Sequence, residues 1–191
     1  MHLLSERLSY QDNKETTTLV ILPPDLGWKR AVMGAWFSMW LIIGGITTHQ
    51  WFTNANDQQR LILVIFMCFW TYFAFRVGRG FFWLLWGKEL IRIDDSALWV
   101  KKSIRGYGKS TPYFHENIEK IRLALPKEGS MQMVYEATEW VVGSGTVEIE
   151  YFGKVIAFGF KLSEKEAKQL YQVVLKRLEE KMKMIEKKRY V

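Results

Sequence analysis

Two long apolar stretches in the N-terminal half constrain the fold of this chain more than any other feature. The first runs from Ala31 to Phe52 and the second from Leu61 to Trp86, with a short, nearly uncharged connection between them. Each exceeds the roughly 20 residues that a helix needs to cross a hydrocarbon core of about 30 Å. Because lipid offers no water to bare backbone groups, such segments must be helical. The sequence therefore predicts a transmembrane helical hairpin over residues 29–86.

The rest of the chain is enough for one modest soluble domain. The protein has 191 residues, and about 105 of them follow the hairpin as a predicted cytoplasmic domain, residues 87–191. Residues 1–28 lack a basic segment followed directly by an apolar core, so we predict an N-terminal cytoplasmic segment and not a cleavable signal peptide. The single cysteine, Cys68, excludes an intramolecular disulfide and a cysteine metal cluster, and is expected to be an apolar packing or lipid-facing residue.

Charge predicts the orientation of the hairpin and its environment. The connection carries Arg60 as its only cation. The cations at the opposite ends of the two stretches are Lys29, Arg30, Arg76, Arg79, Lys88 and Arg92. The positive-inside rule therefore predicts a multi-pass protein of the inner (cytoplasmic) membrane with both termini in the cytoplasm. The formal net charge of +7 suits anionic phospholipids, whereas no motif supports nucleic acid as a partner.

Two features of the hairpin are candidates for lipid or partner contact. Arg76 and Arg79 lie three residues apart and share a helix face. Either they extend to lipid phosphates at the cytoplasmic interface, or they bind a lipid head group or an acidic residue of a partner helix. The second feature is a set of small residues that would allow close helix approach, either within the hairpin itself or to a partner helix, namely Gly34, Ser38, Gly44 and Gly45.

Beyond Lys88 the hydrophobic period changes to two, which predicts about seven short strands. The candidate strands are ELIRIDD, ALWVKKS, GKSTPYFH, NIEKIRLAL, MVYEATEWVV, TVEIEYF and KVIAFGF. One helix is predicted to close the chain, with Ser163 and Glu166 as a capping box. Its apolar stripe is predicted to consist of Ala167, Leu170, Val174 and Leu178, widened by Tyr171 and Leu175. The predicted class is an α+β membrane protein whose cytoplasmic part is a pleckstrin-homology-like (PH-like) antiparallel barrel or sandwich with a C-terminal amphipathic helix.

The layout resembles bacterial integral-membrane proteins that have two N-terminal membrane helices followed by a PH-like domain. The matching stretches are LPPDLGWKR, FAFRVGRG, KELIRIDDSALWVKK and VIAFGFKLSEKEAKQLYQVVLKRL. The stretch IEKIRLALPKEG is similar to a strand and turn of a photosystem I assembly factor of chloroplasts and cyanobacteria. The resemblance implies a fold and a topology, and these families offer no agreed catalytic residues to carry over.

The residues that commonly perform chemistry are sparse. The three histidines, His2, His49 and His115, have no metal-binding spacing with one another or with a cysteine, so no metal site and no cofactor are predicted. His49 is expected to be an interfacial polar residue, with haem or pigment ligation as the alternative. His115 is expected at a solvated strand end. The stretch GYGKS lacks the phosphate-loop spacing and a following helix, so we predict a hairpin turn.

A basic hairpin is the remaining candidate site, and it comprises Lys101, Lys102, Arg105 and Lys109. In many PH domains the corresponding hairpin carries phosphoinositide-binding cations. Three interpretations stay open: specific lipid binding, general attraction to the membrane surface, or a solvated face. The C-terminal basic run, which includes Lys181, allows the same interpretations. Trp99 and Trp140 are expected in strands, where they are core residues or, if exposed, an interface.

These observations favour a small non-enzymatic membrane protein. The predicted role is an accessory subunit or assembly factor of a larger membrane complex, with other integral membrane proteins as partners. The alternative is a membrane-anchored module that senses anionic lipids or a signal. An enzyme or transporter that uses Arg76 and Arg79 ranks last, because two helices cannot enclose a pathway unless the chain oligomerises.

Overall fold

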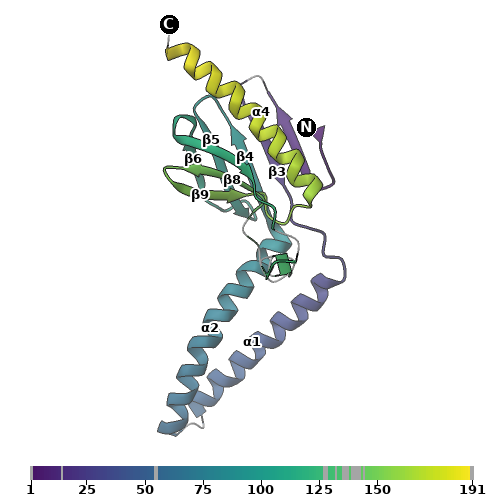
Figure 1. Ribbon diagram of the computed structural model, residues 1–191. Coiled ribbons are helices and arrows are strands. Elements are labelled where there is room, and N and C mark those ends of the chain that lie inside the picture. The colour runs from purple at the N-terminus through teal and green to yellow at the C-terminus, as the bar shows by residue number, and fades with distance from the viewer. Residues whose placement is uncertain are drawn as a thin grey trace. The chain divides into compact units, whose positions relative to one another are not determined.

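The chain divides into two units. The computed structural model describes residues 2–13, 15–53, 56–126, 129–131, 133–134, 138, 143 and 145–189. One unit, here called the sheet domain, combines Met1–Pro24 with Trp86–Val191, and the other, the helical hairpin, is Asp25–Leu85 (Figure 1). The sheet domain is therefore assembled from segments on both sides of the hairpin.

The helical hairpin consists of α1 (Lys29–Thr53) and α2 (Asp57–Trp86), which confirms the two predicted helices. Both are long and apolar enough to cross a membrane. Only 11% and 6% of their most apolar windows are buried, whereas a core helix of a soluble protein would be mostly covered. Asn56 is the N-cap residue of α2. Its Oδ1 accepts a hydrogen bond from the Gln59 N–H, and the Gln59 Oε1 accepts one from the Asn56 N–H.

Glycines allow the two helices to approach each other closely. The Trp70 indole covers Gly44, where a Cβ atom would overlap the ring, and its Nε1 donates to the Trp40 carbonyl at 3.0 Å. On α2, a Cβ atom at Gly78 would lie 2.9 Å from the Phe37 ring. Close approach through small residues is therefore confirmed at Gly44, and Gly78 is a contact that the sequence analysis missed.

The other predicted small residues differ in their surroundings. A Cβ atom at Gly34 would make an ordinary contact with Phe81, 3.5 Å away. Gly45 has nothing within 4 Å of a Cβ position, and Ser38 is exposed. Gly45 and Ser38 therefore do not serve the packing of α1 on α2, because a helix turns about 100° per residue and only some small residues can face the neighbouring helix. Contact of these two residues with a partner helix stays a prediction.

The sheet domain contains two antiparallel sheets. The first has the order β1-β2-β3-β4-β5-β6 and the second has the order β7-β8-β9. The strands of the first sheet are β1 (His2–Leu3), β2 (Leu8–Asp12), β3 (Thr17–Ile21), β4 (Gly87–Ile93), β5 (Ala97–Ile104) and β6 (Ser110–Phe114). The second contains β7 (Ile118–Leu123), β8 (Val147–Tyr151) and β9 (Lys154–Phe158). The short 3-10 helix η1 (His115–Asn117) joins β6 to β7.

Three strands lie before the hairpin, where the sequence analysis assigned none. Strand β3 pairs with β4, and its register places Leu19 opposite Ile91 and Ile21 opposite Glu89. The burial of β3 alternates along TTLVI, so its Thr17, Leu19 and Ile21 side chains face the core. The first sheet thus joins a strand that precedes the membrane helices to the strand that follows them.

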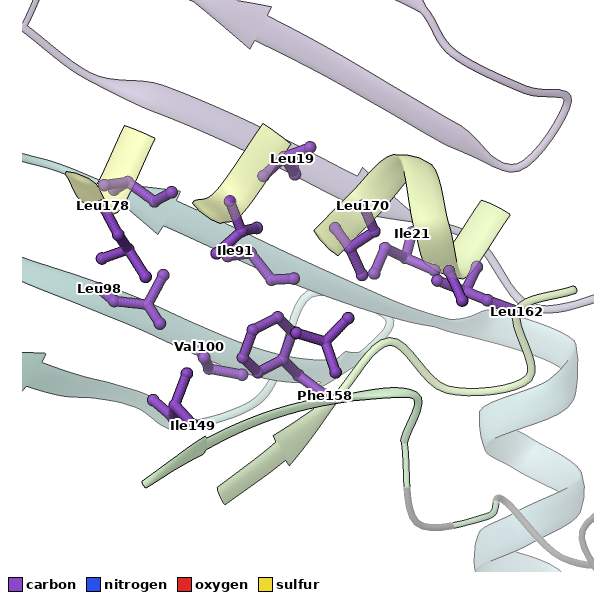
Figure 2. Packing of buried hydrophobic residues seen from close by; sticks show 14 of the residues in the cluster. Leu19, Ile21, Ile91, Leu98, Val100, Ile149, Phe158, Leu162, Leu170 and Leu178 are labelled. Carbon is purple, nitrogen blue, oxygen red and sulfur yellow. The ribbon is translucent and has the colours of Figure 1, made fainter. Parts of the chain in front are cut away.

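One hydrophobic core lies between the two sheets and α4 (Glu164–Arg189). In Figure 2 the labelled side chains from both sheets and from α4 point toward one another. Ala167, Leu170, Val174 and Leu178 are at most 2% exposed, which confirms the predicted stripe. The capping box is also confirmed, since the Glu166 Oε2 accepts from the Ser163 N–H at 2.9 Å and the Ser163 hydroxyl accepts from the Glu166 N–H at 3.4 Å.

The α+β class is confirmed, and the two sheets are open. The outer strands β1, β6, β7 and β9 each pair on one side in the described part of the chain. Of the predicted strand MVYEATEWVV, Met133 and Val134 are helical, and the rest apart from Thr138 lies outside the described residues. The PH-like fold of the sheet domain stays a prediction.

Candidate membrane and partner contact sites

The turn between β5 and β6 carries two of the predicted site residues, Arg105 and Lys109, and both are exposed. Residues Arg105–Lys109, here called the hairpin tip, follow Ile104, which exchanges two backbone hydrogen bonds with Tyr107 at 2.9 and 3.0 Å. Arg105 has a φ of 51°, a strained value for a residue with a side chain. The next residue of the turn has a φ of 90°, and this residue is Gly106, which adopts such a φ without strain. Tyr107 is 86% exposed, and Lys109 is exposed as well.

Arg105 fastens the hairpin tip to the last residue of α2. Its guanidinium lies 3.9 Å from the centre of the Trp86 ring, a cation–π distance. Its backbone N–H donates to the Trp86 carbonyl at 3.1 Å. Both contacts lie within the sheet domain. The tip is therefore held at the point where the chain leaves the membrane helix.

The other two cations of the basic hairpin lie in different surroundings. The register pairs Lys102 with Glu89 and Lys101 with Leu90, so the two lysines point to opposite faces of the sheet. The Lys102 ammonium lies 4.0 Å from the centre of the Phe160 ring and donates to the Ala157 carbonyl at 3.5 Å. The four predicted cations thus share a hairpin but do not converge on one point.

Glu89 is a buried acid that the sequence analysis did not single out. Its side chain is fully buried, and its Oε2 accepts hydrogen bonds from the Gly159 and Phe160 N–H groups at 2.9 and 3.2 Å. Its Oε1 has no hydrogen-bond partner among the described residues. Burial raises the pKa of Glu89 to about 7, against the opposing effects of the two N–H groups and the Lys102 charge.

The signal for Glu89 was present in the sequence. Glu89, Ile91 and Ile93 alternate along β4, so the pattern that buries the two isoleucines also buries the acid. The acid stabilises the connection between β9 and α4, because its carboxylate holds the two successive N–H groups there. Gly159 in that connection has a φ of 80°, and a Cβ atom would lie 2.9 Å from both the Leu170 Cδ2 and the Thr146 Oγ1.

Arg76 and Arg79 are both exposed on α2. At about 100° per residue they lie about 160° and 100° around the helix from Gly78, which faces α1. Arg76 therefore points away from the contact between the two helices, and Arg79 points to the side of it. Arg76 donates to the Tyr72 hydroxyl one turn earlier at 3.0 Å. They are placed where lipid or a partner helix can reach them.

An apolar groove on the helical hairpin extends from Tyr72 toward the connection between the two helices. It has a volume of about 660 Å³, and its lining comes from both helices, including Trp51, Phe52, Met67 and Tyr72. The Thr48 hydroxyl in its wall donates to the Gly44 carbonyl at 2.8 Å, so it needs no polar ligand. Such a groove can accept hydrocarbon or apolar side chains of a partner helix.

His115 and Trp99 support the turn between β4 and β5. His115 is 1% exposed with its Nε2 2.8 Å from the Asp94 carbonyl oxygen, so the expectation of a solvated position is wrong. Trp99 donates from Nε1 to the Asp94 Oδ2 at 2.7 Å and is half-buried. Burial alone would raise the pKa of Asp94, but hydrogen bonds from Ala97, Ser96 and Trp99 hold it below its usual value. Trp140 lies outside the described residues.

Within the described ranges, no three His, Cys, Asp or Glu side chains gather in a way that could hold a metal ion. No family model matches the chain, and no curated protein or solved structure matches it significantly. A function for this chain therefore has to follow from its own residues.

Proposed function

We propose that this protein is a non-enzymatic accessory subunit or assembly factor of a larger membrane complex in the bacterial inner membrane. The observation that carries the proposal is the pair of apolar helices whose side chains are almost entirely uncovered. Lipid and partner helices would cover them, with both termini and the sheet domain in the cytoplasm by the positive-inside rule. The protein would act by positioning its partners.

The use of charged side chains in the sheet domain supports a binding and structural role. Arg7 donates to the Lys161 carbonyl at 2.7 Å and to the Leu22 carbonyl, which ties the N-terminal strands to the start of α4. Glu166 accepts from the Ser5 hydroxyl at 2.8 Å. At the other end of α4, Lys181 is 5% exposed and pairs with Asp95. These ionisable groups join strands, turns and helix.

We also assign the sheet domain to the PH-like class as part of this proposal. Two antiparallel sheets with one long C-terminal helix packed on their common core support the assignment. In this chain β1–β3 would be an N-terminal addition to the first sheet. A domain of this kind binds partners through its loops and sheet edges, without a catalytic centre.

Within the membrane, the partner contacts would involve the apolar groove and the face that carries Arg76 and Arg79. The groove provides an apolar surface, and the two guanidinium groups can pair with phosphates or with an acidic residue of a partner. Both surfaces belong to the helical hairpin.

Two experiments test the proposal in sequence. The full-length chain should stay in the membrane pellet after an alkaline carbonate wash, and gentle detergent extraction should recover it with other integral membrane proteins, identified by mass spectrometry. Replacing both Arg76 and Arg79 with Glu should reduce co-purification, whereas replacing Arg60 with Glu in the connection should not. Recovery of a monomer without any partner would contradict the accessory-subunit role.

The second candidate function is an anionic-lipid or signal sensor that uses Lys101, Lys102, Arg105 and Lys109. The contact of Arg105 with Trp86 favours it, because that contact keeps Arg105 at the residue where α2 ends. A change in partner binding on addition of anionic lipid would support this function over a purely structural one.

A further inference from the structure

The hairpin tip combines a basic segment with an exposed aromatic side chain. No acidic residue occurs between Asp95 and Glu116, while that segment carries four cations, Lys101, Lys102, Arg105 and Lys109. At its tip, Tyr107 stands 86% exposed between two glycines. Tyrosine places an apolar ring and a polar hydroxyl at a membrane surface, where aromatic residues are enriched.

The tip is attached to a fixed point on a membrane helix. The Arg105 N–H donates to the Trp86 carbonyl at 3.1 Å, and the Arg105 guanidinium lies 3.9 Å from the centre of the Trp86 ring. Trp86 is the last residue of α2. The height of the tip above the bilayer therefore depends on where α2 ends.

The length of α2 indicates that it ends in the head-group layer. Its 30 residues span about 45 Å at 1.5 Å per residue, and a bilayer with its head groups is about 40–45 Å thick. If Asp57 lies at one surface, Trp86 lies among the head groups of the other. Tyr107 follows Arg105 by two residues, which is at most about 7.6 Å between Cα atoms. The head-group layer of one leaflet is itself about 5–7 Å thick, so the tip is within its reach.

We infer that the hairpin tip contacts the surface of anionic phospholipid, with Tyr107 in the head-group layer and Arg105 and Lys109 beside lipid phosphates. This inference rests on the membrane anchorage in the proposed function. It adds a second attachment, which restrains the sheet domain at the bilayer. The attraction comes from the two tip cations and one aromatic ring, so it requires anionic lipid but no particular head group.

The test uses the full-length protein in vesicles. A Cys68→Ala background allows one environment-sensitive NBD label to be placed by Tyr107→Cys, with Glu116→Cys as the control. Glu116 is exposed at the opposite end of β5 and β6, since Ala97 pairs with Phe114 there. At about 3.3 Å per residue this end is about 25 Å from the tip, well beyond the Debye length of about 8 Å.

The vesicles consist of phosphatidylcholine alone or with phosphatidylglycerol. In the anionic vesicles, the label at 107 should shift its emission to the blue and be quenched by lipids that carry a spin label near the head group. The label at 116 should report water. The shift at 107 should be reversed by Arg105→Glu with Lys109→Glu, and weakened in about 1 M salt, where the Debye length is about 3 Å.

Because the label replaces Tyr107, a second variant carries it at Lys109→Cys with the tyrosine in place. Adding Tyr107→Ser to that variant should reduce the quenching. Two outcomes would overturn the inference while the anchorage stands, provided that the vesicles retain the protein after carbonate washing. In the first the label at 107 reports water, and in the second the labels at 107 and 116 are equally shielded. Equal shielding with and without phosphatidylglycerol would overturn the assignment to anionic lipid. Release of the protein by carbonate would overturn the anchorage and the inference together.

Discussion

Glu89 makes the stability of the sheet domain depend on pH. Its pKa rises from an ordinary 4.5 to about 7 because burial disfavours the carboxylate. The folded state therefore binds more protons than the unfolded state between these two values, and stability falls as the pH rises through this window. A pKa shift of this size contributes about 3 kcal/mol to the free energy of unfolding at low pH, and this contribution is almost completely lost above pH 8.

Glu89→Gln should remove this pH dependence, because an amide oxygen still accepts from Gly159 while no charge forms. The measurement is urea unfolding of the detergent-solubilised protein between pH 5 and 8. Glu119→Gln on the exposed face of β7 is the matched control and should keep the wild-type slope. Lys102→Met should raise the pKa of Glu89 further, since the lysine charge favours the carboxylate. Equal slopes in wild type and Glu89→Gln would contradict this account.

Gly44 and Gly45 are neighbours on α1, and replacing each with alanine should have opposite effects on stability. Alanine favours a helix over glycine by about 1 kcal/mol at either position. At Gly45 a Cβ atom meets nothing within 4 Å, so Gly45→Ala should stabilise the helix. At Gly44 the Cβ atom overlaps the Trp70 ring, so Gly44→Ala should force the helices apart and cost about 1–3 kcal/mol. SDS-induced unfolding from mild detergent measures both variants, and equal behaviour of the two would contradict the packing of α1 on α2.

At the scale of the elements, the predictions succeeded where a strong period was present. The apolar runs of α1 and α2 are long enough to cross a membrane, which requires a helix. The stripe of α4 from Ala167 to Leu178 has the helical period of an amphipathic helix. Strand β8, VEIEY, alternates between apolar and charged residues, and β4 alternates in burial. Strands β1 and β2 are two and five residues long and carry little strand signal. Strand β3, TTLVI, does carry one, but its pairing partner β4 lies on the other side of the membrane hairpin, so the sequence analysis did not join it to the sheet.

The candidate site was predicted less completely than the fold. The sequence identifies Arg105 as one of several cations, but its contact with Trp86 depends on a turn that brings together residues 19 positions apart. His115 looked like a strand end, although its ring is buried beside the Asp94 carbonyl. Local patterns report which residues alternate, whereas a contact between distant segments depends on the register of the whole sheet.

For the whole molecule, strands on either side of the membrane hairpin form one domain, and this makes the domain inseparable from its N-terminus. Residues 87–191 alone lack Leu8, Leu19 and Ile21, each at most 1% exposed in the core. Burying three such side chains contributes roughly 5–9 kcal/mol, comparable to the total stability of a typical domain, about 5–15 kcal/mol. The isolated fragment should therefore be unfolded or aggregated.

A fusion of residues 1–24 to residues 86–191 should restore the fold without the membrane helices. Ile21 pairs with Glu89 in an antiparallel register, so continuing that register places Pro24 close to Trp86. A flexible linker of about six residues is then long enough to join them. Cooperative thermal unfolding, followed by circular dichroism, should appear in the fusion and be lost again on Leu19→Asp. Cooperative unfolding of residues 87–191 alone, at the same temperature as the fusion, would show that β1–β3 are dispensable, and the core would then be confined to the segment that follows the hairpin.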